Sequence, residues 1–201
     1  MSEKRATYQD VLDAPEHMIA EIVGGELRLS PRPAVPHSAV ITHLSFTLGP
    51  PFGMGQGGPG GWIILIEPEL HLGDDIFVPD LCAWRRERLA SLTDDAYISL
   101  APDWVCEVLS HSTERLDRAE KTPAYFHHGV EYIWLLHPRR RILEALRRDP
   151  PTWRAIGTYT ETDRVRIAPF DAIELDLATL WTNVARPTRA SDAAFDHELG
   201  L

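Results

Sequence analysis

The chain has 201 residues, of which 44% are hydrophobic and 25% charged, and its formal net charge is −10. This length and composition fit one globular domain with a full core. The negative charge argues against a simple nucleic-acid coating protein, because such proteins bind phosphates through a cationic surface. No apolar run approaches the length of a membrane span, and the first ten residues lack the apolar core of a signal peptide. We therefore expect a cytoplasmic protein with no membrane contact.

The chain up to Gly61 predicts a short helix, a hairpin, a longer helix and a flexible loop. Thr7 and Asp10 resemble a capping box, and Gly24-Gly25 separate two apolar segments as a hairpin turn does. Pro36 precedes an amphipathic pattern, and the loop has seven glycines in thirteen residues. In order, the expected ranges are 7–14, 17–30, 37–48 and 49–61.

The second part of the chain predicts strands interrupted by two helices. Pro68 breaks or bends the first strand, which suggests an edge position, and Pro123 should kink or split the longer helix. The two cysteines lie in predicted strands, which indicates buried reduced thiols. Strands are expected over 62–72, 76–83, 104–109, 131–136, 142–146, 153–160 and 165–168, helices over 85–92 and 113–128, and a peripheral tail from 182.

One carboxylate, Glu107, stands in the middle of the apolar strand 104–109. Strand side chains alternate faces, so Glu107 shares a face with Val105 and Leu109. Burying an ionisable group there is costly unless it is paired or holds a cation. From this strand alone, an edge-strand carboxylate that reaches water is an equally good interpretation.

A second acid, Asp80, has a similar apolar setting, and the two acids together could hold a hard divalent cation such as Mg²⁺. The dipeptide Pro-Asp occurs again at Pro102-Asp103. However, Asp103 precedes Glu107 by four residues, roughly 13 Å along a strand, which is too far for one shared ion. We therefore expect Asp80, on a neighbouring strand, to be the partner of Glu107.

Lysine is rare in this chain: 18 of the 20 basic residues are arginine, and Lys121 is the only lysine outside the N-terminal tail. Lysine is a compact charge whose pKa shifts readily, whereas arginine stays protonated. Lys121 is thus a candidate for orienting a water or holding a phosphate. An ordinary i, i+4 salt bridge from Asp117 to Lys121 remains the alternative.

Short motifs in a fixed order resemble the Uma-two family, a group of restriction endonucleases in the PD-(D/E)XK nuclease superfamily. The resemblance covers about residues 7 to 181. In chain order, its motifs are Glu21-Ile-Val-Gly-Gly-Glu-Leu27, His37, Val78-Pro-Asp-Leu81, Ala101-Pro-Asp-Trp-Val-Cys-Glu-Val-Leu-Ser110, Ser112-Thr113, Asp117-x3-Lys121-x3-Tyr125, Gly129-Val130 and Trp134.

This resemblance implies an α/β fold with a restriction-endonuclease-like core, in which a central mixed β-sheet is flanked by helices and extended by a β-meander. It implies a single domain over residues 1–181, followed by the peripheral tail 182–201. The implied activity is cleavage of DNA phosphodiester bonds with Mg²⁺ or Mn²⁺. We expect DNA as the substrate and a homodimer as the assembly.

The resemblance also implies roles for individual residues. Asp80 and Glu107 would be metal ligands, and Glu21 would bind the metal or orient a water. The superfamily lysine would fall at position 109, which is leucine here, so Lys121 is the candidate to replace it.

The histidines are harder to assign. His111 and His137 depart from the usual family motifs, and indicate either neutral substitutions or a drifted site. His37 matches a family position and could touch the site or make a structural hydrogen bond. The nine histidines show no spacing typical of a zinc site.

Two other functions stay open. A nuclease fold that no longer cuts could serve as a binding or interaction module, which the acidic charge and Leu109 favour. Metal-dependent hydrolysis of another phosphoester would use the same residues, and fold similarity does not decide the chemistry.

Overall fold

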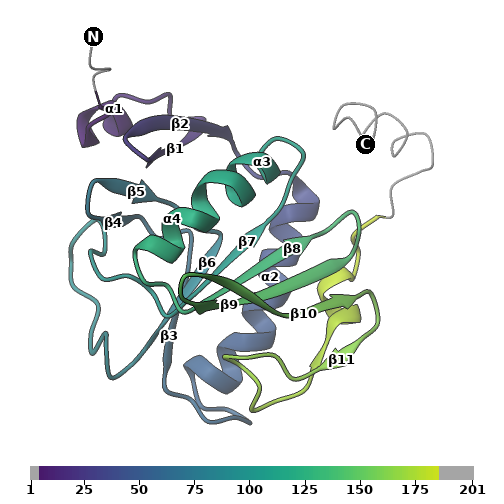
Figure 1. Ribbon diagram of the computed structural model, residues 1–201. Coiled ribbons are helices and arrows are strands. Elements are labelled where there is room, and N and C mark those ends of the chain that lie inside the picture. The colour runs from purple at the N-terminus through teal and green to yellow at the C-terminus, as the bar shows by residue number, and fades with distance from the viewer. Residues whose placement is uncertain (1–4, 186–201) are drawn as a thin grey trace.

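The computed structural model describes residues 5–185, and its main element is a six-stranded mixed β-sheet (Figure 1). Only the central pair β7–β8 is parallel, and the other neighbours are antiparallel. The expected mixed sheet with its meander is therefore confirmed. In spatial order the strands are β10 (Thr152–Thr160), β9 (Ile142–Asp149), β8 (Tyr132–His137), β7 (Trp104–Val108), β6 (Leu81–Arg85) and β3 (Trp62–Ile66).

A helical crossover joins β7 to β8, as a parallel pair requires. It consists of α3 (Glu114–Leu116), the π-helical turn η2 (Asp117–Lys121) and α4 (Thr122–His127). The helix predicted over 113–128 is thus present, and Pro123 does not split it. Proline lacks an N–H, so Pro123 cannot donate the usual hydrogen bond within the helix. At the end of η2, the N–H and the hydroxyl of Thr122 both donate to the Asp117 carbonyl, so the chain widens by one residue just before Pro123.

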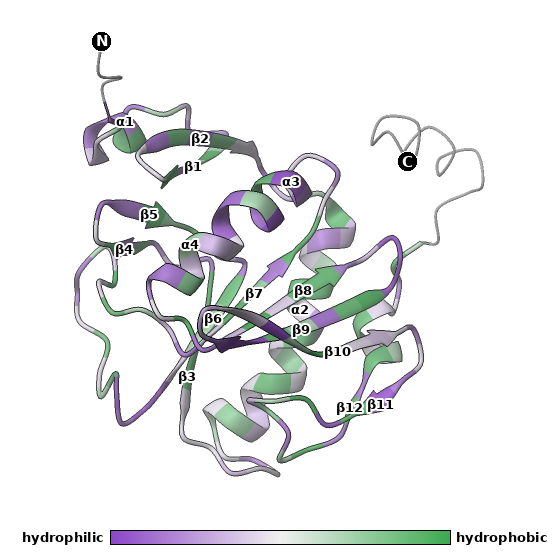
Figure 2. Cartoon of the chain, in the orientation of Figure 1, coloured by the Kyte–Doolittle hydropathy of each residue, from purple (hydrophilic) through white to green (hydrophobic). Residues whose placement is uncertain are grey.

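The strands of the large sheet bury apolar side chains on both faces. Hydrophobic stretches of these strands are green in Figure 2. One face carries Trp104, Cys106 and Val108, and packs against α2 (Val35–Leu48) and residues 167–184. The other face carries Val105 and Leu109, and packs against α4. In Figure 1, α2 lies behind the sheet and α4 in front of it. Glu107 therefore points to the α4 face, as the alternation of the strand predicts.

A smaller four-stranded sheet adjoins the α4 side of the core. Val23, Leu72 and Phe77 of this sheet pack in one cluster with Tyr125 of α4. The predicted hairpin supplies two of its strands, and the short predicted helix α1 (Tyr8–Leu12) precedes it. The spatial order is β2 (Glu26–Pro31), β1 (Met18–Val23), β5 (Asp75–Phe77) and β4 (Leu70–Leu72).

The structure corrects several predicted elements in the middle of the chain. The strand predicted over 76–83 is two strands in different sheets, because β5 ends at Phe77 and β6 begins at Leu81. Asp80 therefore lies in the connection between the sheets and not on a strand. The helix predicted over 85–92 is wrong: Arg85 is the last residue of β6, paired with Trp62 on β3, and a turn follows.

Two further corrections concern loops. The predicted flexible loop begins with the π-helical turn η1 (Gly49–Gly53), whose Pro51 and Phe52 are buried. The strand predicted over 165–168 is only β11 (Arg164–Val165), which pairs with β12 (Leu175–Asp176) ahead of the 3₁₀ turn η3 (Leu177–Trp181). The break at Pro68 is confirmed, since β3 and β4 belong to different sheets and β3 is an edge strand.

The remaining expectations concern the thiols, the tail and the membrane. Cys82 and Cys106 are buried and unpaired, in the clusters on opposite faces of the sheet. Val184 is buried in the larger cluster, and residues 186–201 of the expected tail lie outside the described residues. Within residues 5–185, no helix has the length and apolar character needed to cross a membrane.

Candidate active site

A cavity of about 170 Å³ lies where the two sheets and the crossover helix meet. Four acids and one lysine line it, although they come from distant parts of the chain. Its rim is formed by the end of β2, the proline-rich connection to α2 and the serine-rich turn before α3. The acids and the lysine are Glu21, Asp80, Glu107, Asp117 and Lys121. Every site residue that the sequence predicts therefore faces this one cavity.

Glu107 lies between the other charged residues of the cavity and is only 2% exposed. Its Oε1 accepts hydrogen bonds from the Tyr125 hydroxyl at 2.6 Å and from the Lys121 ammonium at 2.8 Å. Its Oε2 faces Asp80, whose backbone N–H donates to it at a long 3.4 Å. The edge-strand alternative is excluded, because β7 lies in the middle of the sheet and Glu107 does not reach water.

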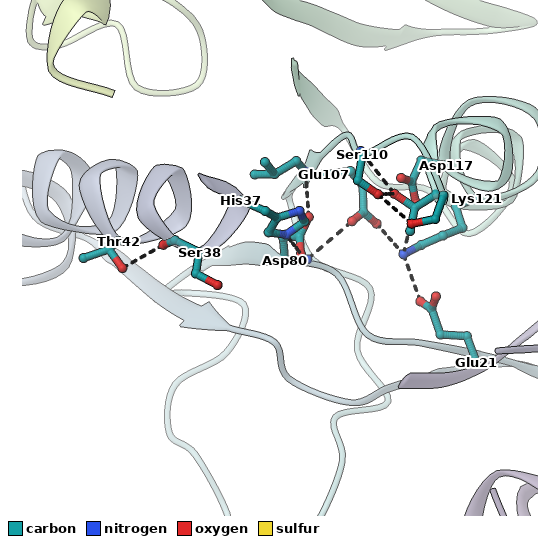
Figure 3. Close-up of polar contacts among 12 residues, drawn as sticks. Glu21, His37, Ser38, Thr42, Asp80, Glu107, Ser110, Asp117 and Lys121 are labelled. Carbon is teal, nitrogen blue, oxygen red and sulfur yellow. Dashed lines mark hydrogen bonds and ion pairs between the residues drawn. The ribbon is translucent and has the colours of Figure 1, made fainter. Parts of the chain in front are cut away.

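Asp80 lies beside Glu107 because of the antiparallel register of β6 and β7. Leu81 pairs with Cys106, so the residue before Leu81 falls next to the residue after Cys106. One Asp80 oxygen, Oδ2, accepts the Val108 N–H at 2.6 Å, and the other, Oδ1, lies 2.7 Å from His37 Nε2 (Figure 3). His37, at the start of α2, thus makes a hydrogen bond inside the site.

Lys121 reaches the acids from the helix and is 3% exposed. Its ammonium is 2.8 Å from Glu107 and 2.9 Å from Glu21, but 3.7 Å from Asp117. The local i, i+4 contact is therefore the longest of the three, and the two long-range contacts dominate. Leu109, at the position of the superfamily lysine, is buried in the apolar cluster of the same face.

Burial and crowded charge shift several pKa values in this cavity. Burial raises the pKa of Glu107 well above its usual range, against the opposing charge of Lys121, and neighbouring Asp117, Asp80 and Glu21 raise it further. Burial alone would lower the pKa of Lys121, but the carboxylates of Glu107 and Glu21 outweigh it and raise that pKa. Lys121 is therefore protonated at neutral pH.

Two neighbours of the acids complete the electrostatic picture. Burial raises the pKa of Asp117 to about 6, while Lys121 and a hydrogen bond from Thr113 oppose the shift. Burial and the charge of Glu107 raise the pKa of Tyr125, so this phenol stays a neutral donor. No role in the site was predicted for Asp117 or Tyr125 from the sequence. Their spacing with Lys121, four residues on either side, was the available signal, because it puts all three on one helix face.

The other candidate residues lie outside the cavity. His111 and His137 line a neighbouring, mostly apolar cavity, which shares Ala34, His37, Ser110 and Ser112 with the first one. Burial lowers the pKa of His137, and its Nδ1 accepts the Arg140 N–H. Asp103 bonds Arg88 and the Arg85 N–H at the opposite end of β7, so its exclusion from the site is confirmed.

The donor set suits a hard divalent cation. Within residues 5–185, no three His, Cys, Asp or Glu side chains converge as metal ligands. The carboxylates of Asp80 and Glu107 line the same cavity, and Glu107 Oε2 accepts only the long hydrogen bond from the Asp80 N–H. Mg²⁺ is commonly held by one or two carboxylates, with water and substrate phosphate completing its shell. Two adjacent oxygen ligands therefore fit Mg²⁺ or Mn²⁺ better than zinc, which prefers histidine and cysteine.

Comparison with known proteins identifies the family of this chain. Residues 6–179 match the model of the Uma2 family, which is described as "Putative restriction endonuclease". The chain belongs to this family. The resemblance seen in the sequence is thereby confirmed.

The fold has a solved counterpart, a putative nuclease belonging to DUF820 from Anabaena variabilis ATCC 29413. The two structures share a TM-score of 0.71 and 21% sequence identity, over 88% of this chain and 98% of that chain. At this identity the likeness shows the fold, and the expected nuclease-like α/β core is confirmed. No curated protein matches the chain.

Proposed function

We propose that this Uma2 protein is a nuclease that hydrolyses DNA phosphodiester bonds with Mg²⁺ or Mn²⁺. One observation carries the proposal: Asp80 and Glu107 meet in one cavity beside the protonated ammonium of Lys121. Two acids for an ion and a fixed positive charge are what phosphodiester hydrolysis needs. The restriction-endonuclease description of the family and the nuclease description of the Anabaena protein support the same reaction class.

Asp80 and Glu107 are the residues that would hold the ion. When bound, a divalent cation stabilises the negative charge that develops on the phosphate and lowers the pKa of the attacking water. The protein fixes both ligands before any ion arrives. The Val108 N–H and His37 hold the two oxygens of Asp80, and the Tyr125 hydroxyl holds Oε1 of Glu107.

Lys121 supplies positive charge rather than acting as a base. Its raised pKa means that it keeps its proton at neutral pH, so it cannot accept one from water. Its ammonium can instead orient the attacking water and stabilise charge on the phosphate, as preorganised donors do. The expected homodimer remains a prediction, which the molar mass in solution by light scattering would test.

The decisive assay offers the purified protein supercoiled plasmid and single-stranded DNA with Mg²⁺, Mn²⁺ or EDTA. The proposal expects cleavage with either ion, none with EDTA, and none by Glu107→Gln. A folded protein that binds DNA without cutting it would be a binding module. Hydrolysis of a small phosphodiester but not of DNA would indicate another phosphoester hydrolase. Either result would overturn the proposal.

A further inference from the structure

Glu107 divides the cavity into two halves, because its two oxygens face different partners. Oε2 faces Asp80, whose other contacts are His37 and the Val108 N–H. Oε1 faces Lys121 and Tyr125. Figure 3 shows Asp80 on one side of Glu107 and Lys121 on the other. An ion between Asp80 and Oε2 would leave the contacts of Oε1 in place.

Glu21 belongs to the Lys121 half. Its Oε1 accepts the Val78 N–H at 2.8 Å and the Lys121 ammonium at 2.9 Å, and the residue is 3% exposed. In Figure 3 the Lys121 ammonium lies between Glu107 and Glu21. The Lys121 ammonium therefore separates Glu21 from Glu107 Oε2, the oxygen on the Asp80 side where the ion is proposed to lie.

We propose that Glu21 is a positioning residue, which holds the Lys121 ammonium beside Glu107, and that Asp80 and Glu107 hold the ion without it. This assignment rests on the proposed nuclease function and differs from the ligand role that the family resemblance implies for Glu21. Only two carboxylates remain for the ion, consistent with the lack of a three-residue cluster within residues 5–185. Without the Glu21 carboxylate, the Lys121 ammonium would have only Glu107 and Asp117 as partners.

The anchoring of Glu21 also links the two halves of the site. Val78, which donates to Glu21, lies two residues before Asp80 in the connection from β5 to β6. The same short connection therefore places Asp80 next to Glu107 and fixes the carboxylate that holds Lys121. The small sheet, through Glu21 on β1, thus contributes to the site on the large sheet.

The pairing is tested first without metal, by a double-mutant cycle of melting temperature in EDTA. The four proteins are wild type, Glu21→Gln, Lys121→Met and the double variant. Because each single change strands a buried partner, the double variant should lose less than the sum of the two losses. The control cycle pairs Asp80→Asn with Lys121→Met and should be closer to additive. Additive losses in the Glu21 cycle would overturn the proposal.

The role is tested next by ion affinity, measured by titration calorimetry with Mn²⁺. Glu21→Gln should bind Mn²⁺ within about threefold of wild type, whereas Asp80→Asn should weaken it by about 30-fold or more. With plasmid DNA, Glu21→Gln should keep its KM but lose about 10²-fold in kcat, as when a positioned charge is lost. Glu21→Asp, which keeps the charge but shortens the side chain, should also lower kcat and leave KM unchanged.

The outcomes separate this inference from the proposed function. Equal losses of Mn²⁺ affinity in Glu21→Gln and Asp80→Asn would make Glu21 a ligand and overturn the inference. Absence of Mn²⁺ binding or cleavage in the wild type would end the nuclease proposal, while the metal-free cycle would still decide whether Glu21 holds Lys121.

Discussion

The chain contains the dipeptide Pro-Asp twice, and the two copies lie at opposite ends of the same pair of strands. Asp80 precedes β6 and faces the cavity beside Glu107. Asp103 precedes β7, where its Oδ2 accepts the Arg85 N–H at 2.8 Å and its Oδ1 pairs with Arg88 at 2.8 Å. Asp103 therefore ties β7 to the end of β6.

Strand direction causes this difference. Because β6 and β7 are antiparallel, the start of β6 lies beside the end of β7, where Glu107 is. The start of β7 lies at the other end of the pair, next to Arg85. Asp103 meets a backbone donor and a cation. Asp80 meets the Val108 N–H and His37, and it lies beside the buried carboxylate of Glu107. The Asp103 end of the strand pair therefore stabilises the fold, whereas the Asp80 end brings buried charged groups together.

The sharpest test of the comparison is the pair Asp80→Asn and Asp103→Asn. The first change should reduce metal-dependent DNA cleavage by about 10³-fold, because it removes a carboxylate from the proposed ion site. The second should leave kcat and KM unchanged in protein that is confirmed to be folded. Rates on supercoiled plasmid under single-turnover conditions measure both. Equal losses in the two variants would contradict the division of roles.

Lys121 should be next in effect, because it is the only cation that contacts Glu107 among the described residues. Lys121→Arg should lose about 10²-fold in kcat, since a guanidinium keeps the charge but has another shape in a buried site. Lys121→Met should lose at least as much, and its free energy of unfolding should fall by about 3 kcal/mol, because buried carboxylates lose their partner.

Cleavage rates and denaturant unfolding of the two Lys121 variants check these values. Arg118→Lys is a matched control on the same helix, since Arg118 pairs with Glu114 and Glu144 away from the cavity. It should cut normally. Full activity of Lys121→Arg would show that only the charge matters there.

The sequence predicts those parts of the fold and the site that depend on local patterns along the chain. Apolar alternation placed Glu107 on one face of its strand, and spacing ruled out Asp103 as its partner. Both conclusions need only local geometry, since strand period and rise are fixed. The scarcity of lysine singled out Lys121, and the family motifs added Glu21. The hairpin, the crossover helix and the meander also followed from local patterns.

Contacts between distant segments of the chain could not be predicted from the sequence. Asp80 was expected on a strand, because Val78 and Leu81 continue its apolar pattern across Pro79, but the chain changes sheets there. The π-helical turn at Lys121 depends on the missing N–H of Pro123 and on the bond from Thr122 to Asp117. The contact between Lys121 and Glu21 joins the two sheets, so no single segment predicts it.

The stability of the two ends offers a third test. Asp103→Ala should lower the free energy of unfolding by about 2 kcal/mol, because it leaves the partly buried Arg85 N–H without its acceptor. Asp80→Ala likewise leaves the Val108 N–H without its acceptor, but it also removes a carboxylate whose charge opposes that of Glu107, so it should cost less in the metal-free protein. Urea unfolding in EDTA measures both. A larger cost for Asp80→Ala would reverse the comparison.

The smallest expected effect is the pH dependence that Asp117 gives to the charged end. Burial raises its pKa to about 6 from an ordinary 3.8, so the folded protein holds this proton more tightly than the unfolded chain. The stabilisation from the proton is complete below about pH 4 and is lost as the pH rises through about 6. Asp117→Asn, whose side chain has the same shape and no charge at any pH, should not show this loss of stability. The free energy of unfolding of the wild type should therefore fall by about 1–2 kcal/mol relative to Asp117→Asn between pH 4 and 7. Urea unfolding of both proteins in EDTA across this range checks the sign. A gap that stays constant, or that moves in favour of the wild type, would mean that the Lys121 ammonium already neutralises Asp117 and that the crowding at this end falls on Glu107 alone.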